Sequence, residues 1–447
     1  MKSKFFAEFD SFYFVGICGV SMSALAQFAV AARKKVGGSD RDLSSAGRLR
    51  ALGIKVNGGG TRALADYDVV VCTDAVGRCD PELKLARALG KPVISRGKLL
   101  ADVCGNFSRT VAVSGCHGKT TCTAMLASAF FAAGARFGAH IGGMAAGFGN
   151  FYLSGNDLFI TEACEYKKNF MLLSPDTAVV LNTDTDHLEC YSDEEELRAC
   201  YAKFAMRAGT AVVPAGSGLA SLGNAVTFGG GGDFRAEEVV QERGNYSFTL
   251  VAYGKRECTV KLAVPGEHNV NNALAAAAAA RAEGLGFGDI CRGLCSFRGV
   301  ERRMQLIGRL HGARCVADYA HHPAEIASAI KTASSFTEGR LFVIFQPHTY
   351  SRTKNLFPQF VGVLSGVQKL LIYRTFAARE YFDCEGSALT LSRAVRSSRY
   401  GDSPEDILKF VFGAKPGDTI LFLGAGDIYF RAPSLPEAAA CCVFLSG

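Results

Sequence analysis

Short apolar runs alternate with stretches of helical spacing from the start of the chain. The runs "FYFVGICG" at 12–19 and "YDVVVCTDAV" at 67–76 have the continuous apolar character of strands that are buried on both faces. Between them, "SMSALAQFAVAARK" at 21–34 repeats apolar residues at helical intervals. Strands that alternate with helices in this way predict βαβ units around a parallel sheet.

The same alternation restarts twice further along the chain. One restart is "RTVAVSG" at 109–115, and the other follows "CSFRGVERRM" at 295–304. In between, residues 246–266 alternate apolar and polar side chains, which indicates antiparallel strands. A chain of 447 residues is too long for one ordinary core. We therefore predict an α/β fold of three domains: a Rossmann-like parallel-sheet domain (1–105), a central P-loop ATPase domain with a small antiparallel sheet (106–300), and a C-terminal Rossmann-like domain (301–447).

Composition narrows the classes of protein. The formal net charge is +7, yet residues 106–300 carry more Asp and Glu than Lys and Arg. That distribution suits anionic small ligands with a metal between them, although a plain solvated surface explains it equally. Basic blocks with interleaved aromatic residues are missing, so a nucleic-acid partner is not expected. The N-terminal "MKSKFFAEFD" lacks the apolar core of a signal peptide, and no stretch reaches the length of a membrane span, so no membrane partner is expected.

Sixteen cysteines are scattered along the chain, many of them inside apolar runs. Their spacing shows no disulfide framework, and buried thiols behave as small hydrophobic groups. We therefore expect reduced cysteines and a cytoplasmic protein.

The stretch "VAVSGCHGKTT" at 111–121 places a glycine turn between a predicted strand and a predicted helix. Backbone N–H groups in such a turn converge on a phosphate, the lysine reaches the terminal phosphates, and the following hydroxyl ligates Mg²⁺. The turn is shorter than a strict P-loop, because Val113 stands where a glycine is usual, and a structural glycine turn is the alternative. The predicted ATP-binding residues here are Gly115, Cys116, His117, Gly118, Lys119, Thr120 and Thr121.

Two further apolar runs end in acidic residues. Carboxyl ends of parallel strands share one edge of a sheet, and hard carboxylate oxygens there suit Mg²⁺. Helix capping by the aspartates is the competing explanation. The residues are Glu162 and Glu165 in "ITEACEY", and Asn182, Asp184, Asp186 and His187 in "LNTDTDH".

Polar clusters also follow the later runs. "PGEHNVNNAL" offers His268, Asn269 and Asn272, whose amides suit a purine edge, with a capped helix as the alternative. "DYAHHPAE" and "FQPHTYSRT" bring basic and aromatic side chains that suit a carboxylate, and zinc is disfavoured because no further ligand lies at the usual spacing. The residues in this last pair are Asp318, Tyr319, His321, His322, His348 and Arg352.

The first glycine turn, Gly16 to Ser21, keeps only part of a dinucleotide-binding fingerprint, since Cys18 and Ser21 replace glycines. It still offers backbone amides to a diphosphate. A nicotinamide dehydrogenase is the alternative that this turn raises, but no residue set for hydride transfer accompanies it.

Taken together, these motifs resemble the Mur ligase family over nearly the whole chain. "FVGICGVSMSALA", "GCHGKTT", "EACE", "NTDTDH", "PGEHNVNNAL", "FRGVERR", "DYAHHPAEI" and "FQPHTYSRT" occur in the family's order. The last two are most typical of the branch that adds alanine. The resemblance implies three domains, which bind a UDP-sugar, bind ATP, and deliver the amino acid.

The resemblance also implies a role for each matching residue. UDP-sugar would lie at Gly16, Gly19, Ser39 and Asp40. Lys119 would hold ATP phosphates, Asn272 adenine with His268 nearby, and Asp318 the ribose. Thr120, Glu162 and His187 would bind Mg²⁺, and Arg303 would neutralise charge on the transferred phosphoryl group. Tyr319, His321, His348 and Arg352 would orient the amino acid. The predicted catalytic residues are Lys119, Arg303, His187 and His321.

By this resemblance the substrates are UDP-N-acetylmuramate, L-alanine and ATP, with Mg²⁺ as cofactor. ATP would phosphorylate the sugar's carboxylate, and the amine of alanine would then attack the acyl phosphate. A Mur-type ligase for another amino acid or a peptide, and a catalytically silent sensor that keeps the fold, stay open as alternatives. Ala317 and Thr349 depart from the family pattern near the expected amino-acid site.

Overall fold

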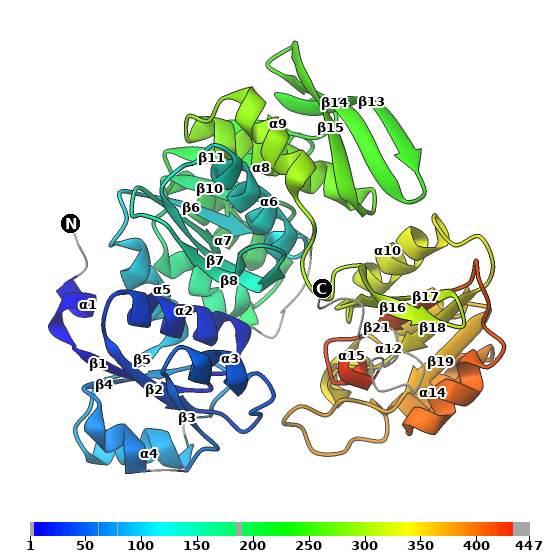
Figure 1. Ribbon diagram of the computed structural model, residues 1–447, viewed down its shortest axis with the longest axis horizontal. Coiled ribbons are helices and arrows are strands. Elements are labelled where there is room, and N and C mark those ends of the chain that lie inside the picture. Colours follow the sequence, from blue (N-terminus) through cyan, green and yellow to red (C-terminus); the bar gives the residue numbers. More distant parts are fainter. Residues whose placement is uncertain (1–3, 61, 78, 185–189, 432–447) are drawn as a thin grey trace. The chain divides into compact units, whose positions relative to one another are not determined.

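The computed structural model describes residues 4–60, 62–77, 79–184 and 190–431 (Figure 1). It divides into two compact units, one formed by 1–239, 247–262 and 268–298, the other by 240–246, 263–267 and 299–447. Within the described ranges, no helix is long and apolar enough to span a bilayer. The first unit contains the first sheet and most of the central sheet, and the second unit contains the third sheet.

The first sheet has five parallel strands in the order β3-β2-β1-β4-β5, the doubly wound arrangement that the alternating pattern predicts. Every residue of β1 is buried, as expected for a strand covered by helices on both faces. The strands are β1 (Ser11–Val15), β2 (Lys35–Ser39), β3 (Lys55–Asn57), β4 (Val69–Cys72) and β5 (Val93–Ser95). The helices of this region are α1 (Lys4–Glu8), α2 (Val20–Ala31), α3 (Ala46–Ala51), α4 (Pro81–Ala88) and α5 (Arg96–Cys104).

The central sheet has ten strands in the order β15-β14-β13-β12-β11-β10-β6-β9-β7-β8. β6 lies between β9 and β10 and is parallel to both. The strands are β6 (Arg109–Ser114), β7 (Phe137–Ala145), β8 (Gly149–Leu153), β9 (Leu158–Glu162), β10 (Thr177–Val180), β11 (Thr210–Pro214), β12 (Ala225–Phe228), β13 (Phe234–Glu242), β14 (Asn245–Ala252) and β15 (Lys255–Pro265). The helices are α6 (Lys119–Ala132), α7 (Glu194–Met206), α8 (His268–Ala282) and α9 (Phe287–Ser296).

The strands expected as a small antiparallel sheet extend the central sheet as one of its edges. Arg243 and Gly244, and then Tyr253 and Gly254, have positive φ between successive strands, as two-residue hairpin turns require. In β15 buried and exposed residues alternate from Thr259 onward, so one face of this strand is exposed to solvent. The sequence predicted antiparallel strands within 246–266, but it did not predict β13 or the attachment of these strands to the parallel ones.

One continuous apolar cluster runs through both sheets of the first unit. It includes Phe12 and Val71 from the first sheet and Ala112 and Phe159 from the second. Helix α2 packs against β7 and β8 of the central sheet. The loops at the ends of the two sheets are therefore carried on a shared core.

Helices α6, α8 and α9 pack together on the central sheet (Figure 1). Gly293 of α9 lies against the backbone of α6, since a Cβ at this position would fall 2.3 Å from the Cα of Ala129. The backbone of Gly293 is helical, so glycine is not needed here for an unusual φ. It is needed because any side chain would collide with the backbone of α6.

A disulfide joins Cys258 of β15 to Cys291 of α9, so the expectation of reduced cysteines throughout was wrong at this pair. The two residues are 33 positions apart and lie on different elements. Only the packing of α9 beside the sheet brings them together, and no local spacing indicates it. Among the described residues no second disulfide is present.

The second unit is built on a six-stranded sheet in the order β16-β17-β21-β18-β19-β20. All its pairings are parallel except that of β16 with β17. The α/β class predicted for the chain is confirmed in all three sheets. The strands are β16 (Gln305–Leu310), β17 (Ala313–Asp318), β18 (Leu341–Phe345), β19 (Lys369–Tyr373), β20 (Ser398–Gly401) and β21 (Thr419–Leu423). The helices are α10 (Pro323–Ser334), α11 (Tyr350–Asn355), α12 (Phe357–Leu364), α13 (Ala388–Ala394), α14 (Pro404–Val411) and α15 (Ile428–Arg431).

Candidate active site

The expected phosphate loop joins β6 to α6. Gly115 and Gly118 have φ values of 128° and 86°, which residues other than glycine rarely adopt. Gly118 is the N-cap residue of α6. Lys119 and Thr120 form the first turn of the helix, where backbone N–H groups and the helix dipole favour an anion. The strand, turn and helix that the sequence predicts around this loop are therefore present.

Lys119 folds back over the loop and is buried against Glu165. Its Nζ lies 3.0 Å from both carboxylate oxygens of Glu165 and donates to the carbonyl oxygens of Gly115 and Cys116 at 2.5 and 3.1 Å. The side chains are 16% and 2% exposed. Burial by itself would lower the pKa of Lys119, but the Glu165 carboxylate outweighs burial and the pKa is raised. Lys119 therefore remains protonated and places its positive charge against the phosphate loop.

Glu162 ends β9 next to this loop, since it pairs in register with Val113 of β6. Its Oε1 accepts a hydrogen bond from the N–H of Gly142 at 2.5 Å, which fixes the carboxylate. Thr120 is buried in the first turn of α6. A carboxylate and a hydroxyl are hard oxygen donors and fit Mg²⁺. His187, the third expected ligand, lies outside the described residues, and the described part of the chain holds no cluster of three His, Cys, Asp or Glu side chains with metal-site geometry.

Two asparagines lie against the loop. Asn182 accepts from the N–H of His117 at 3.2 Å and donates to its carbonyl oxygen at 3.0 Å. Asn272 of α8 lies directly over Gly118, because a Cβ on Gly118 would fall 2.5 Å from its Oδ1. The structure thus brings the predicted Asn272 to the phosphate loop, with His268 at the start of the same helix.

The first glycine turn is closed by the end of β2. The N–H groups of Gly16 and Ile17 donate to the carbonyl oxygen of Ser39 at 2.8 and 3.0 Å. The N–H of Cys18 donates to Oδ2 of Asp40 at 2.9 Å. Gly16, Gly19, Ser39 and Asp40 are therefore gathered in one place, as the sequence predicts.

The hydroxyl of Ser39 faces the protein interior. It donates to the buried Glu82 at 2.5 Å, and Glu82 also accepts from Tyr13 at 2.9 Å. Only the backbone of Ser39 is thus turned toward the glycine turn, so a side-chain contact between Ser39 and a ligand does not fit this geometry.

In the second unit, three predicted residues form an aromatic and imidazole cluster. The ring centroids of Tyr319 and His321 are 5.2 Å apart, and those of His321 and His348 are 5.8 Å apart. Burial lowers the pKa of His321 to about 4, against an opposing effect of Glu325. Burial and the neighbouring His321 lower the pKa of His348 to about 3. Both rings are neutral near pH 7.

The tautomer of His321 follows from its partner. Nδ1 lies 2.9 Å from the carbonyl oxygen of Tyr319, which only accepts, so Nδ1 carries the proton. The Nε2 atom is then the proton acceptor of the ring.

Asp318 and Arg303 lie beside this cluster. Both carboxylate oxygens of Asp318 accept backbone N–H groups, from Met304 and Ala320 at 2.8 Å each. Burial raises the pKa of Asp318, although Arg303 opposes it. The Arg303 guanidinium lies 5.3 Å from the Tyr319 ring centre. Asp318 therefore has a structural role in its strand, and its ribose contact stays a prediction.

Arg352 lies in the first turn of α11, which Thr349 caps. The hydroxyl of Thr349 accepts a hydrogen bond from the N–H of Arg352 at 3.4 Å. Thr349 has a positive φ of 67°, which is uncommon for a residue other than glycine. The positive charge of Arg352 contributes to the low pKa of both His321 and His348. Its place beside the imidazoles agrees with the predicted cluster.

The low pKa of His321 predicts a pH dependence of stability. In the unfolded chain His321 binds a proton below its ordinary pKa near 6.5, whereas in the folded chain it binds one only below about pH 4. We expect the stability of wild type to fall by about 2 kcal/mol more than that of His321→Gln between pH 6.5 and 4. Urea unfolding at several pH values measures this difference, and parallel curves for the two proteins would contradict it.

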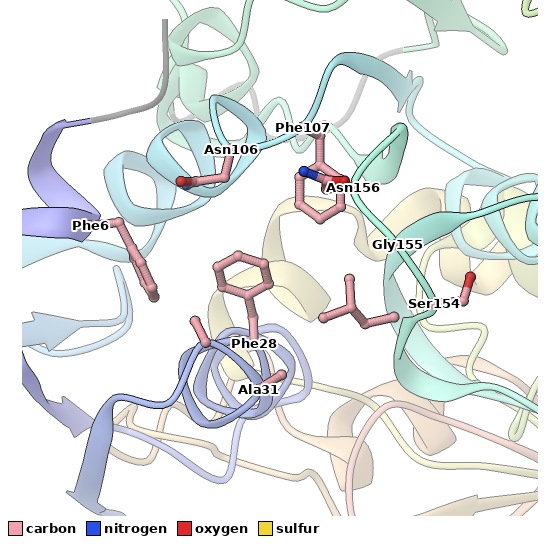
Figure 2. Close-up of a pocket in the computed structure, with 10 residues that line it drawn as sticks. Phe6, Phe28, Ala31, Asn106, Phe107, Ser154, Gly155 and Asn156 are labelled. Atoms are coloured by element: carbon pink, nitrogen blue, oxygen red, sulfur yellow. The ribbon is translucent and has the colours of Figure 1, made fainter.

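A cavity of about 520 Å³ lies away from these loops (Figure 2). It is bounded by the aromatic rings of Phe6, Phe28 and Phe107, and the turn at 153–156 closes one side. None of the predicted site residues lines it. We therefore assign the chemistry to the glycine loops and not to this cavity.

Comparison with known families agrees with the geometry of the loops. Residues 11–108 match the description "Mur ligase family, catalytic domain", 113–280 match "Mur ligase middle domain", and 302–426 match "Mur ligase, glutamate ligase domain". A glycine loop with a buried lysine on such a chain defines an ATP-using ligase, and this chain belongs to the Mur ligase family.

Its relatives point to one member of that family. The UDP-N-acetylmuramate–L-alanine ligases of Acetivibrio thermocellus and Clostridium novyi are 36% and 35% identical to it. These alignments cover 94% and 93% of this chain and 94% and 95% of the relatives. The crystal structure of UDP-N-acetylmuramate-alanine ligase from Thermotoga maritima matches with a TM-score of 0.83 and 28% identity, over 96% of this chain and 99% of that one.

Proposed function

We propose that this chain is an ATP-dependent ligase that joins L-alanine to the carboxylate of UDP-N-acetylmuramate in peptidoglycan precursor synthesis. The observation that carries the proposal is the buried Lys119–Glu165 pair at the phosphate loop, in a chain that aligns with alanine-adding ligases over almost its whole length. The proposal includes a cytoplasmic location, because the proposed reaction consumes ATP. The domain borders near residues 105 and 300 are part of this proposal.

Nucleotide and sugar are assigned to the two loops of the first unit. The UDP-sugar is assigned to the turn of Gly16, Gly19 and Asp40, and the phosphates of ATP are assigned to Gly115–Thr121 beside Lys119. Asn272 and His268 face the adenine side of that loop. Thr120, Glu162 and His187 would hold Mg²⁺, which would neutralise phosphate charge when bound.

The chemistry proceeds in two steps. A carboxylate oxygen of the sugar acid bonds to the γ-phosphorus of ATP, and the bond to the bridging oxygen breaks to release ADP. The amine of alanine then bonds to the acyl carbon, and the C–O bond to phosphate breaks. Lys119 and Arg303 offset the negative charge that gathers when two anions meet.

The second unit supplies the groups for alanine. Tyr319, His348 and Arg352 bind and orient it, with Arg352 as partner of its carboxylate. The attacking amine loses a proton in forming the amide. His321 accepts that proton at Nε2, because its ring is neutral and its Nδ1 is committed to Tyr319.

An amino-acid panel tests the proposal. The protein with Mg·ATP and UDP-N-acetylmuramate is expected to release ADP at least ten times faster with L-alanine than with glycine, L-serine or D-glutamate. ADP release is measured by a coupled assay, and the product is identified by mass spectrometry. Preference for another amino acid or a peptide would assign a different Mur-type ligase, and no ADP with any of them would favour a silent sensor.

A further inference from the structure

The ring of His140 in β7 connects helix α2, which follows the first glycine turn, to strand β9, which ends at Glu162. The side chain is 3% exposed. Its Nε2 lies 2.8 Å from Oγ of Ser21, and its Nδ1 lies 3.0 Å from Oγ1 of Thr161. Ser21 stands in the first turn of α2, directly after the first glycine turn, and Thr161 immediately precedes Glu162. One imidazole thus connects helix α2 to the central sheet.

The direction of each hydrogen bond can be deduced. The Thr161 hydroxyl donates to the carbonyl oxygen of Glu162 at 3.2 Å, so it accepts from His140 and Nδ1 carries the proton. Nε2 is then an acceptor, and Ser21 donates to it while accepting from Nη1 of Arg96 at 3.3 Å. The chain therefore runs from Arg96 through Ser21, His140 and Thr161 to Glu162, with every donor matched to an acceptor.

Such a chain requires a neutral ring, because imidazolium has no acceptor. Burial, and then the nearby Arg96, lower the pKa of His140 to about 3. The ring therefore stays neutral at the pH of the cell and does not act as an acid or a base.

We propose that His140 is a positioning residue of the ligase, which fixes the loop that holds the UDP-sugar relative to the strand end that carries Glu162. This inference rests on the proposed function. The first reaction step needs a carboxylate held on one sheet to lie in line with a phosphoryl group held on the other. A misplacement of about 1 Å between such groups costs roughly a hundredfold in rate.

A plain structural histidine is the alternative, and kinetics separate the two. For His140→Leu, which removes both hydrogen bonds, we expect kcat to fall about 30-fold while KM for ATP changes less than threefold. For His140→Gln, whose amide also offers a donor group and an acceptor group, kcat is expected to recover at least fivefold over His140→Leu. A purely structural loss would not give that split between kcat and KM.

Thr177→Val is the matched control. Thr177 lies at the start of β10, at the end of the strand away from the loop, and its buried hydroxyl donates to Glu283 at 2.6 Å. The control also removes a buried hydrogen bond from this unit, so its stability falls, but its kcat is expected to stay within twofold of wild type.

Ser21→Ala and Thr161→Val probe the same chain if His140→Leu does not fold. Either change is expected to lower kcat, and combining Ser21→Ala with His140→Gln is expected to lower it less than the product of the single effects. Wild-type kcat in His140→Leu, or an equal loss in Thr177→Val, would overturn the inference. Wild type is assayed first: if it makes no UDP-N-acetylmuramoyl-alanine, the proposed function fails, whereas an active wild type with unaffected variants refutes only the role of His140.

Discussion

Lys119→Ala is expected to lower kcat by about a thousandfold or more, the largest effect of any single change in the first unit. The lysine is the cation at the phosphate loop, and positioned charge of this kind accounts for most of the acceleration of phosphoryl transfer. Binding of the UDP-sugar depends on the other loop, so calorimetry is expected to give a Kd within threefold of wild type. Retained turnover would refute the assigned role.

Stability has to be separated from catalysis in this variant. Removing Lys119 leaves the Glu165 carboxylate 2% exposed and without its ion pair, at a cost of about 3 kcal/mol. Adding Glu165→Gln removes the remaining charge. The double variant is expected to regain most of the thermal stability and none of the turnover; recovery of activity together with stability would show that Lys119 acts only through folding.

Gly293→Ala is expected to lower the stability of the first unit by about 3 kcal/mol. The new methyl group would lie 2.3 Å from the Cα of Ala129, and a backbone atom cannot move aside as a flexible side chain can. Helix α9 would have to shift away from α6, whose first turn holds Lys119. Thermal unfolding and kcat measured together are expected to fall together.

Gly288→Ala in the same helix is the control. Its Cβ would meet only Nη1 of Arg292, at 3.6 Å, so the usual helix preference for alanine operates freely. We expect unchanged or slightly increased stability. Equal destabilisation by the two changes would show that the close approach at Gly293 is not the cause.

The sequence predicted those parts of the site that depend on neighbours along the chain. Buried strands, glycine turns and the helix after each turn are local patterns, and the loops at Gly16 and Gly115 lie where those patterns place them. The convergence of Glu162 with the phosphate loop also follows, because adjacent parallel strands share an edge.

Partners that are distant in the chain were not predicted. His140 stands alone in "FGAHIGG", 119 residues from Ser21 and 21 from Thr161, so no spacing indicates its role. The pairing of Lys119 with Glu165 spans 46 residues. Glu165 was noted only as an acidic strand end, because sequence does not show which of two nearby carboxylates turns toward the lysine.

The sequence also could not predict which way each side chain points. Ser39 belongs to a motif of the family, but its hydroxyl points into the core toward Glu82. His187 lies outside the described residues, so its place among the magnesium ligands stays a prediction. The second unit is described by itself, and the roles of Arg303 and His321 in the reaction likewise stay predictions.

The ion pair beneath the phosphate loop makes the charge of Lys119 insensitive to pH. Both oxygens of Glu165 contact a single ammonium group, and the Tyr191 hydroxyl donates to the Glu165 backbone oxygen at 2.5 Å, so the pair is anchored from two directions. The raised pKa of Lys119 lies far above neutrality. Acidification well below neutrality will therefore leave the positive charge of Lys119 unchanged.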